Sequence, residues 1–142
     1  MDNGLRCPFE KAILSARCEC EMATRFSIAE QMGVGCRSHF ACNNCSTLLA
    51  LMRENARFAL GLTNTSGNLA FGKEMKVMIG GLIGLQQVMA QADVADGLRN
   101  VHALVQQAQT AYGSLESLPY QEIVKSIAVF QIKRRGGARP AR

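Results

Sequence analysis

The sequence predicts an all-α fold, a small bundle of about five to six helices with a cysteine-rich metal-binding module at its N-terminus. Helix-forming residues dominate the chain. Apolar residues recur at helical spacing, and alternating runs of β-branched and aromatic residues are scarce. The metal-binding module is predicted because all the cysteines lie in the first third: Cys7, Cys18, Cys20, Cys36, Cys42 and Cys45.

The first predicted elements carry these cysteines. Pro8 suits the first turn of a helix, which is expected to run to about Arg25. Ser27 and Glu30 have the spacing of a capping box, which predicts a short second helix that ends at Gly33. Residues 34–44 show no clear period and are expected to form a loop.

Four longer helices are predicted after this loop, at 47–62, 69–91, 93–112 and from Pro119 onward. The connections are short, so neighbouring helices should pack antiparallel. Gly113 suits the end of the third helix. Gly80 and Gly84 are four residues apart in the second helix, where they predict close packing of another helix or, as an alternative, a groove for a ligand.

The length of 142 residues fits one domain and is sufficient for a core that folds without metal. We predict a single helical domain over 1–133, in which 1–46 form the metal module and 47–133 the bundle. A basic tail over 134–142 is expected to be disordered because it has no apolar anchor.

A cytoplasmic location is expected. Residues 1–6 contain no apolar run, and the longest apolar stretch, 77–85, is far shorter than the roughly 20 residues that span a bilayer. Cytosolic thiols stay reduced, so clustered cysteines indicate metal or redox chemistry better than disulfides.

The spacing of the cysteines predicts the ligands. Cys42 and Cys45 enclose two residues, a spacing that brings two thiolates to one centre. On a helix Cys18 and Cys20 would point about 200° apart, so that only one of them could bind. Cys7 would lie about 16 Å from Cys18 along an unbroken helix and should be dispensable. The predicted ligands are Cys20, Cys36, Cys42 and Cys45; Cys18, Cys7 and His39 are the alternatives.

An iron–sulfur cluster, of the 4Fe-4S type, suits this uneven spacing because its thiolates come from a loop and a distant helix. Structural zinc normally uses two paired knuckles, and only Cys42 with Cys45 forms one. Zinc, a thiol redox switch and ordinary buried cysteines are the alternatives. His102 lies beside an apolar stripe, where a packed or exposed histidine is commoner than a ligand.

No phosphate-binding loop, nucleophile elbow or metalloprotease motif is present in the sequence. The predicted function is therefore an iron–sulfur accessory protein for electron transfer or redox sensing, which docks to a protein partner. The alternative is a zinc-stabilised interaction module, for example a nucleic-acid-associated regulator that uses the basic tail. An enzyme whose residues assemble from distant positions is the third hypothesis.

Two basic segments are candidate interaction surfaces. Arg53 and Arg57 follow the cysteine loop and could meet an acidic partner, although a solvated helix face has the same pattern. In the tail, a polyanion such as nucleic acid could bind Lys133, Arg134, Arg135 and Arg139. A solvated terminus is the alternative, and no aromatic residue interleaves with these arginines to stack on bases.

Overall fold

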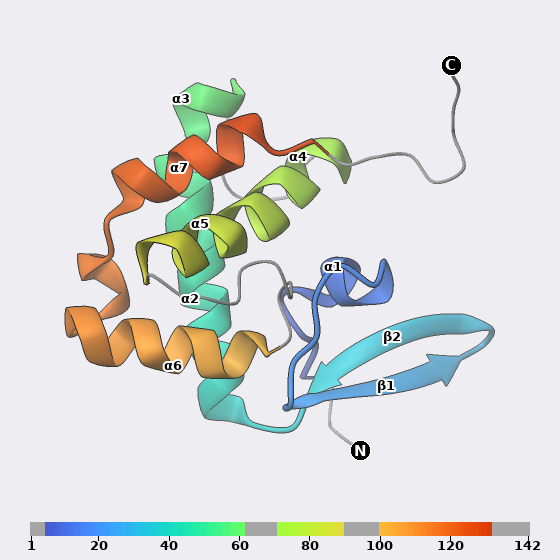
Figure 1. Cartoon of the computed structure of the whole chain (residues 1–142). Helices are drawn as coiled ribbons and strands as arrows, with labels where there is room; N and C mark the ends of the chain where they lie inside the picture. The colour runs from blue at the N-terminus through green and yellow to red at the C-terminus, as the bar shows by residue number, and fades with distance from the viewer. Residues whose placement is uncertain (1–4, 62–70, 90–99, 132–142) are drawn as a thin grey trace.

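The computed structural model describes residues 5–61, 71–89 and 100–131 and is mostly helical (Figure 1). Its elements, in order, are α1 (Glu10–Leu14), β1 (Ala23–Ile28), β2 (Gln31–Cys36), α2 (His39–Asn55), α3 (Arg57–Leu60), α4 (Phe71–Met75), the π-helical η1 (Lys76–Gly80), α5 (Gly81–Val88), α6 (Val101–Tyr112), the 3-10 helix η3 (Leu115–Ser117) and α7 (Tyr120–Val129). The helical prediction is confirmed in this coarse form. The predicted tail and the predicted helix start at Asp93 lie outside the described residues.

The all-α prediction is wrong at the N-terminus, where β1 and β2 form an antiparallel hairpin that projects from the helices (Figure 1). The two-residue turn between the strands is Ala29 and Glu30, which both have positive φ, 52° and 69°. A type I′ hairpin turn needs this conformation at both positions. The predicted capping box is therefore a strand end and a turn, and no helix begins at Ser27.

A close fit between an aromatic ring and a glycine stabilises the hairpin. Phe26 pairs with Gly33 across the strands, and a Cβ atom on Gly33 would lie 2.3 Å from the Phe26 ring. The ring thus covers backbone that a side chain would otherwise occupy. In the sequence Gly33 looks like the end of a helix, because the sequence does not show that Phe26 lies opposite it on the other strand.

The predicted helix from Pro8 to about Arg25 is also wrong, since α1 contains only Glu10–Leu14. Ala16 has a φ of 63°, a left-handed conformation that ends helical structure soon after α1. The segment before α1 instead lies along β2: the Cys7 amide donates to the Val34 carbonyl, and the Cys36 amide donates to the Leu5 carbonyl, at 3.0 Å and 3.1 Å.

Helix α2 is central to the helical body and begins at His39, earlier than predicted. Ser38 is its N-cap, because the Ser38 side chain accepts a hydrogen bond from the Ala41 amide at 3.1 Å. Leu48 and Met52 of α2 are fully buried. The predicted loop over 34–44 is therefore the end of β2 followed by the start of α2.

The segments α4, η1 and α5 form one continuous helix that packs on α7, as the glycine spacing predicts. A Cβ atom on Gly80 would lie 2.8 Å from the Ile127 Cα atom, and one on Gly84 would lie 3.0 Å from the Ile123 carbonyl oxygen. The interpretation of both glycines as helix-packing residues is confirmed. No helix in the described part of the chain is long and apolar enough to cross a membrane.

Gly80→Ala and Gly84→Ala are each expected to lower the free energy of unfolding by about 1–3 kcal/mol, because the added methyl group meets backbone atoms of α7. Gly72→Ala is the matched control in the same helix, since a Cβ there meets nothing within 4 Å. It should leave stability unchanged or raise it by about 0.4–1 kcal/mol. Urea titration followed by circular dichroism measures all three, and equal effects at Gly72 and Gly80 would contradict the packing argument.

Candidate metal centre

Five of the six cysteines line one enclosed cavity between the N-terminal segments, α2 and α6. They are Cys7, Cys20, Cys36, Cys42 and Cys45, here called the cavity cysteines. The remaining wall is mostly apolar, with Phe9, Ile13 and Val101 among its residues. The open space is about 10 Å³, room for about one water molecule.

The cavity cysteines come from segments that are scattered along the sequence. Cys7 precedes α1, Cys20 lies between α1 and β1, and Cys36 ends β2. Cys42 and Cys45 are one helical turn apart in α2 and so share a face. Folding of the hairpin and α1 against the first turns of α2 is what brings these thiols together.

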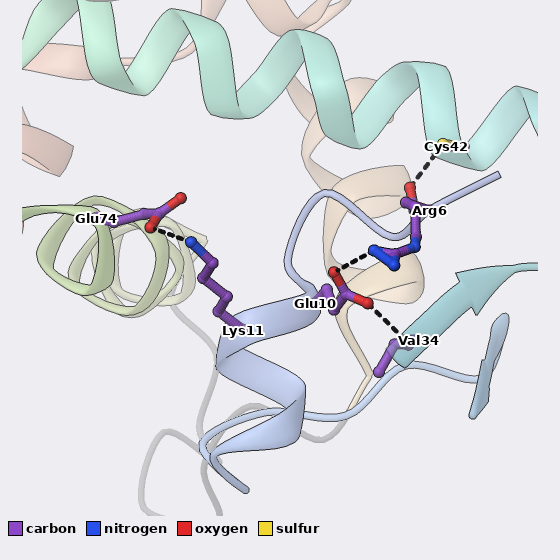
Figure 2. Close-up of polar contacts among 6 residues, drawn as sticks. All are labelled: Arg6, Glu10, Lys11, Val34, Cys42 and Glu74. Carbon is purple, nitrogen blue, oxygen red and sulfur yellow. Dashed lines mark hydrogen bonds and ion pairs between the residues drawn. The ribbon is translucent and has the colours of Figure 1, made fainter. Parts of the chain in front are cut away.

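A polar network fixes α1 beside the cavity (Figure 2). The Glu10 carboxylate accepts a hydrogen bond from the Val34 amide at 2.8 Å and pairs with Arg6 at 3.2 Å. Lys11 pairs with Glu74 of α4 at 2.8 Å. Helix α1 is thereby connected to the hairpin on one side and to the helical body on the other.

Several cavity sulfurs accept hydrogen bonds from the protein. The backbone N–H of Phe9 donates to Cys7, and the backbone N–H groups of Met22 and His102 donate to Cys20. Such donors favour the thiolate over the thiol. They are the type of contact that tunes thiolates bound to an iron–sulfur cluster.

Burial raises the pKa values of four of the cavity cysteines and so opposes the effect of these hydrogen bonds. Desolvation raises the pKa of Cys7 to about 12 and also raises the pKa values of Cys20, Cys42 and Cys45, with smaller contributions from neighbouring cysteines. At neutral pH the cysteines with raised pKa are therefore neutral thiols when no metal is present. A bound metal must displace their protons and supply the compensating positive charge.

In the described residues, no three His, Cys, Asp or Glu side chains form a group that could hold a metal ion in these positions. Ligation therefore requires the cysteine side chains to adjust around the ion or cluster. The donors themselves fit soft metal chemistry, because several thiols face one apolar space.

The structure separates the two neighbouring cysteines of the predicted C-x-C pair. Cys20 lines the cavity, whereas Cys18 is only 3% exposed and packs in the main apolar core. Among the other predicted candidates, His39 is exposed in the first turn of α2 and is not part of the cavity wall. The reason for leaving Cys7 out was an unbroken helix that does not exist, and Cys7 is a cavity cysteine.

His102 is the cavity residue that sequence reasoning undervalued. It lies in the first turn of α6, and its Nε2 atom is 3.7 Å from the Glu21 carboxylate. The Asn100 side chain accepts hydrogen bonds from the Glu21 and Ala103 amides, which fixes this helix start beside Cys20. Asn before an apolar helix is a recognisable N-cap, but its proximity to Cys20 is a tertiary property.

The predicted partner-binding arginines lie on α2 and α3. Arg57 pairs with Glu54 at 3.2 Å. Arg53 lines an open groove along α2 whose wall includes Leu49 and Pro8. Because Pro8 also lines the cysteine cavity, this groove lies directly beside the candidate centre. The predicted polyanion site at Lys133, Arg134, Arg135 and Arg139 lies outside the described residues.

Comparison of the chain with known protein families, curated proteins and solved structures found no match.

Proposed function

We propose that this protein holds an iron–sulfur cluster between its cavity cysteines and serves electron transfer or redox sensing as an accessory of a protein partner. The observation that carries the proposal is the convergence of five thiols from separate segments on one enclosed apolar space. A buried thiol by itself is an ordinary core residue, as Cys18 illustrates. Random burial does not explain five thiols around the same cavity.

The origin of these donors fits a cluster better than a structural zinc ion, and because the open space is only about 10 Å³, the cavity walls must move apart to hold a cluster. The thiols come from a strand end, a loop and a helix rather than from two knuckles. The cavity also offers backbone N–H donors to Cys7 and Cys20, where they would offset the negative charge of a thiolate-bound cluster. When bound, the cluster would supply a one-electron redox change at this position.

The groove beside the cavity supports the partner-docking part of the proposal. Pro8 belongs to the walls of both, so a protein that lies in the groove would be close to the cluster. Arg53 and Glu54 both line the groove, so a partner surface that carries charges of both signs would complement it. A redox partner and a signalling partner would both reach the cluster by binding in this groove.

Protein purified without oxygen is expected to be brown, with absorption near roughly 400 nm and with both iron and acid-labile sulfide bound. Iron, sulfide and zinc are measured on the same sample. Chelation should bleach the protein but leave most of its far-ultraviolet helical signal, because most of the apolar core lies in the helical body. Colourless protein that holds zinc would support the zinc-stabilised module, and metal-free protein after iron and sulfide reconstitution would contradict any metal function.

A further inference from the structure

The β-hairpin has one outer edge that the rest of the fold covers, along β2. There the Val34 carbonyl accepts a hydrogen bond from the Cys7 amide at 3.0 Å, and the Val34 amide donates to the Glu10 carboxylate at 2.8 Å (Figure 2). The Cys36 amide donates to the Leu5 carbonyl at 3.1 Å. The backbone groups of Val34 and Cys36 therefore point away from β1.

This direction determines which backbone groups of β1 point away from β2. Val34 lies opposite Arg25 in the register of the hairpin. Because the Val34 backbone groups bond on the far side of β2, Val34 and Arg25 are a non-hydrogen-bonded pair of the antiparallel ladder. The N–H and C=O groups of Arg25 then point outward as well, and so do those of Ser27, two residues further along the strand.

The outer edge of β1 is open at these two residues. No described residue hydrogen-bonds to the outward backbone groups of Arg25 and Ser27, and both residues are exposed. Nearer the helices the edge is closed, because the Ala23 amide donates to the Cys20 carbonyl at 3.1 Å. The open part belongs to the hairpin that projects from the helices (Figure 1). Such an edge is a template for another strand.

The backbone of β1 is complementary to a second copy of itself. In an antiparallel pair with Phe26 opposite Phe26 of the second copy, Arg25 of each copy lies opposite Ser27 of the other. Each of these two pairs can exchange two backbone hydrogen bonds, so that every outward N–H and C=O group of both residues obtains a partner. The contact is the same on both copies, as a two-fold axis requires.

Charge favours this register over its neighbour. A register centred one residue earlier would place Arg25 directly opposite Arg25 of the second copy, and like charges directly opposite destabilise a strand pair. Centred on Phe26, the pairing places the neutral Ser27 there instead. Arg25 is also paired with Glu19 of its own chain at 2.9 Å, which reduces its repulsion of the second arginine.

The apolar side chains of β1 fit the same pairing. Ile28 is 66% exposed and shares a face of the strand with Phe26. In the pair it lies opposite Thr24 of the second copy and diagonal to Phe26 of that copy, within reach of the ring. The Phe26 ring itself lies over Gly33 of β2 and so away from the open edge, where it does not obstruct a second strand.

We propose that two copies of this chain pair through β1 and form a four-stranded antiparallel sheet across a two-fold axis. β1 leads from the helices to the tip of the hairpin, so antiparallel pairing places the two helical bodies at opposite ends of this sheet (Figure 1). Two short strands bury less than the roughly 800 Å² per partner of a stable complex, so the dimer is weak and reversible. The proposal does not use the cavity cysteines and is independent of the proposed cluster.

Sedimentation of the full chain in reducing buffer, from micromolar to millimolar concentration, should show a reversible rise in mass from 15.4 kDa toward twice that value. S27K places a lysine opposite Arg25 of the second copy and should raise the dissociation constant about 3–30-fold, whereas S27E should lower it by a similar factor. Q31K and Q31E are the matched controls. Gln31 is exposed on the same hairpin but belongs to β2, so both changes should leave the constant unaltered.

Amide hydrogen exchange locates the interface without any substitution. The Arg25 and Ser27 amides should exchange rapidly in dilute protein and become protected at high concentration, whereas the Phe26 amide, which points to β2, should be protected in both. Wild-type protein that stays monomeric at millimolar concentration would overturn the proposal and leave the edge to an extended segment of another protein. A dimer whose Ser27 variants behave like the Gln31 controls, or whose Arg25 and Ser27 amides stay unprotected, would overturn it as well.

Discussion

Replacing Cys45 with serine is expected to empty the candidate metal centre. Cys45 is 7% exposed, and the other four cavity cysteines surround it. A serine hydroxyl is a harder donor with a far higher pKa, so it replaces a soft thiolate poorly. Bound iron should fall below about a tenth of the wild-type content in anaerobically reconstituted protein, measured together with acid-labile sulfide.

Cys18→Ser is the matched control for Cys45→Ser. Cys18 is also buried, at 3% exposure, and belongs to the same main core as Cys45, but it does not line the cavity. Its replacement should cost about 1–3 kcal/mol of stability for burying a hydroxyl, while the iron content stays unchanged. Circular dichroism of both variants separates loss of ligation from loss of fold. Equal iron content in the two variants would remove Cys45 from the site.

Ile127→Ala is expected to be among the most destabilising single changes in the helical body, at about 2–5 kcal/mol. Ile127 of α7 is fully buried, and it packs where Gly80 and Gly81 let the two helices approach closely. Truncation to alanine leaves a cavity, and the two helices cannot move closer to fill it because their backbones are already in contact at Gly80. Urea unfolding of the metal-free protein gives the loss without a contribution from metal binding.

Val129→Ala in the same helix is the control for Ile127→Ala. Val129 is 75% exposed, so its truncation removes little buried surface. The expected change is within about 0.5 kcal/mol. A similar loss at both positions would mean that α7 is held by its helix propensity rather than by packing against α5 and η1.

The sequence by itself determines the helical body. The apolar stripe that includes Leu48 and Met52 becomes the buried face of α2, and Pro119 directly precedes α7. Gly80 and Gly84 are packing residues, as their spacing predicts. These features are local: periodicity, caps and small residues act within one helix, and the helix then buries the face that the pattern defines.

Only the tertiary structure shows the hairpin. The turn at Ala29 and Glu30 contains neither Asn nor Gly, the usual signals for positive φ, so the same letters fit a helix start. Phe26 covers Gly33 from the neighbouring strand, and the local sequence pattern does not show that these two residues meet. The helix predicted before it, to about Arg25, is shorter because Ala16 adopts a left-handed conformation and β1 begins at Ala23.

The candidate site shows the same division. The sequence identifies cysteine clustering as the informative feature. Its spacing favours Cys20, Cys36, Cys42 and Cys45 as ligands over Cys18 and Cys7, whereas in the structure Cys7 lines the cavity and Cys18 does not. Chain folding decides which side chains line the cavity, because burial acts between segments that spacing alone cannot bring together.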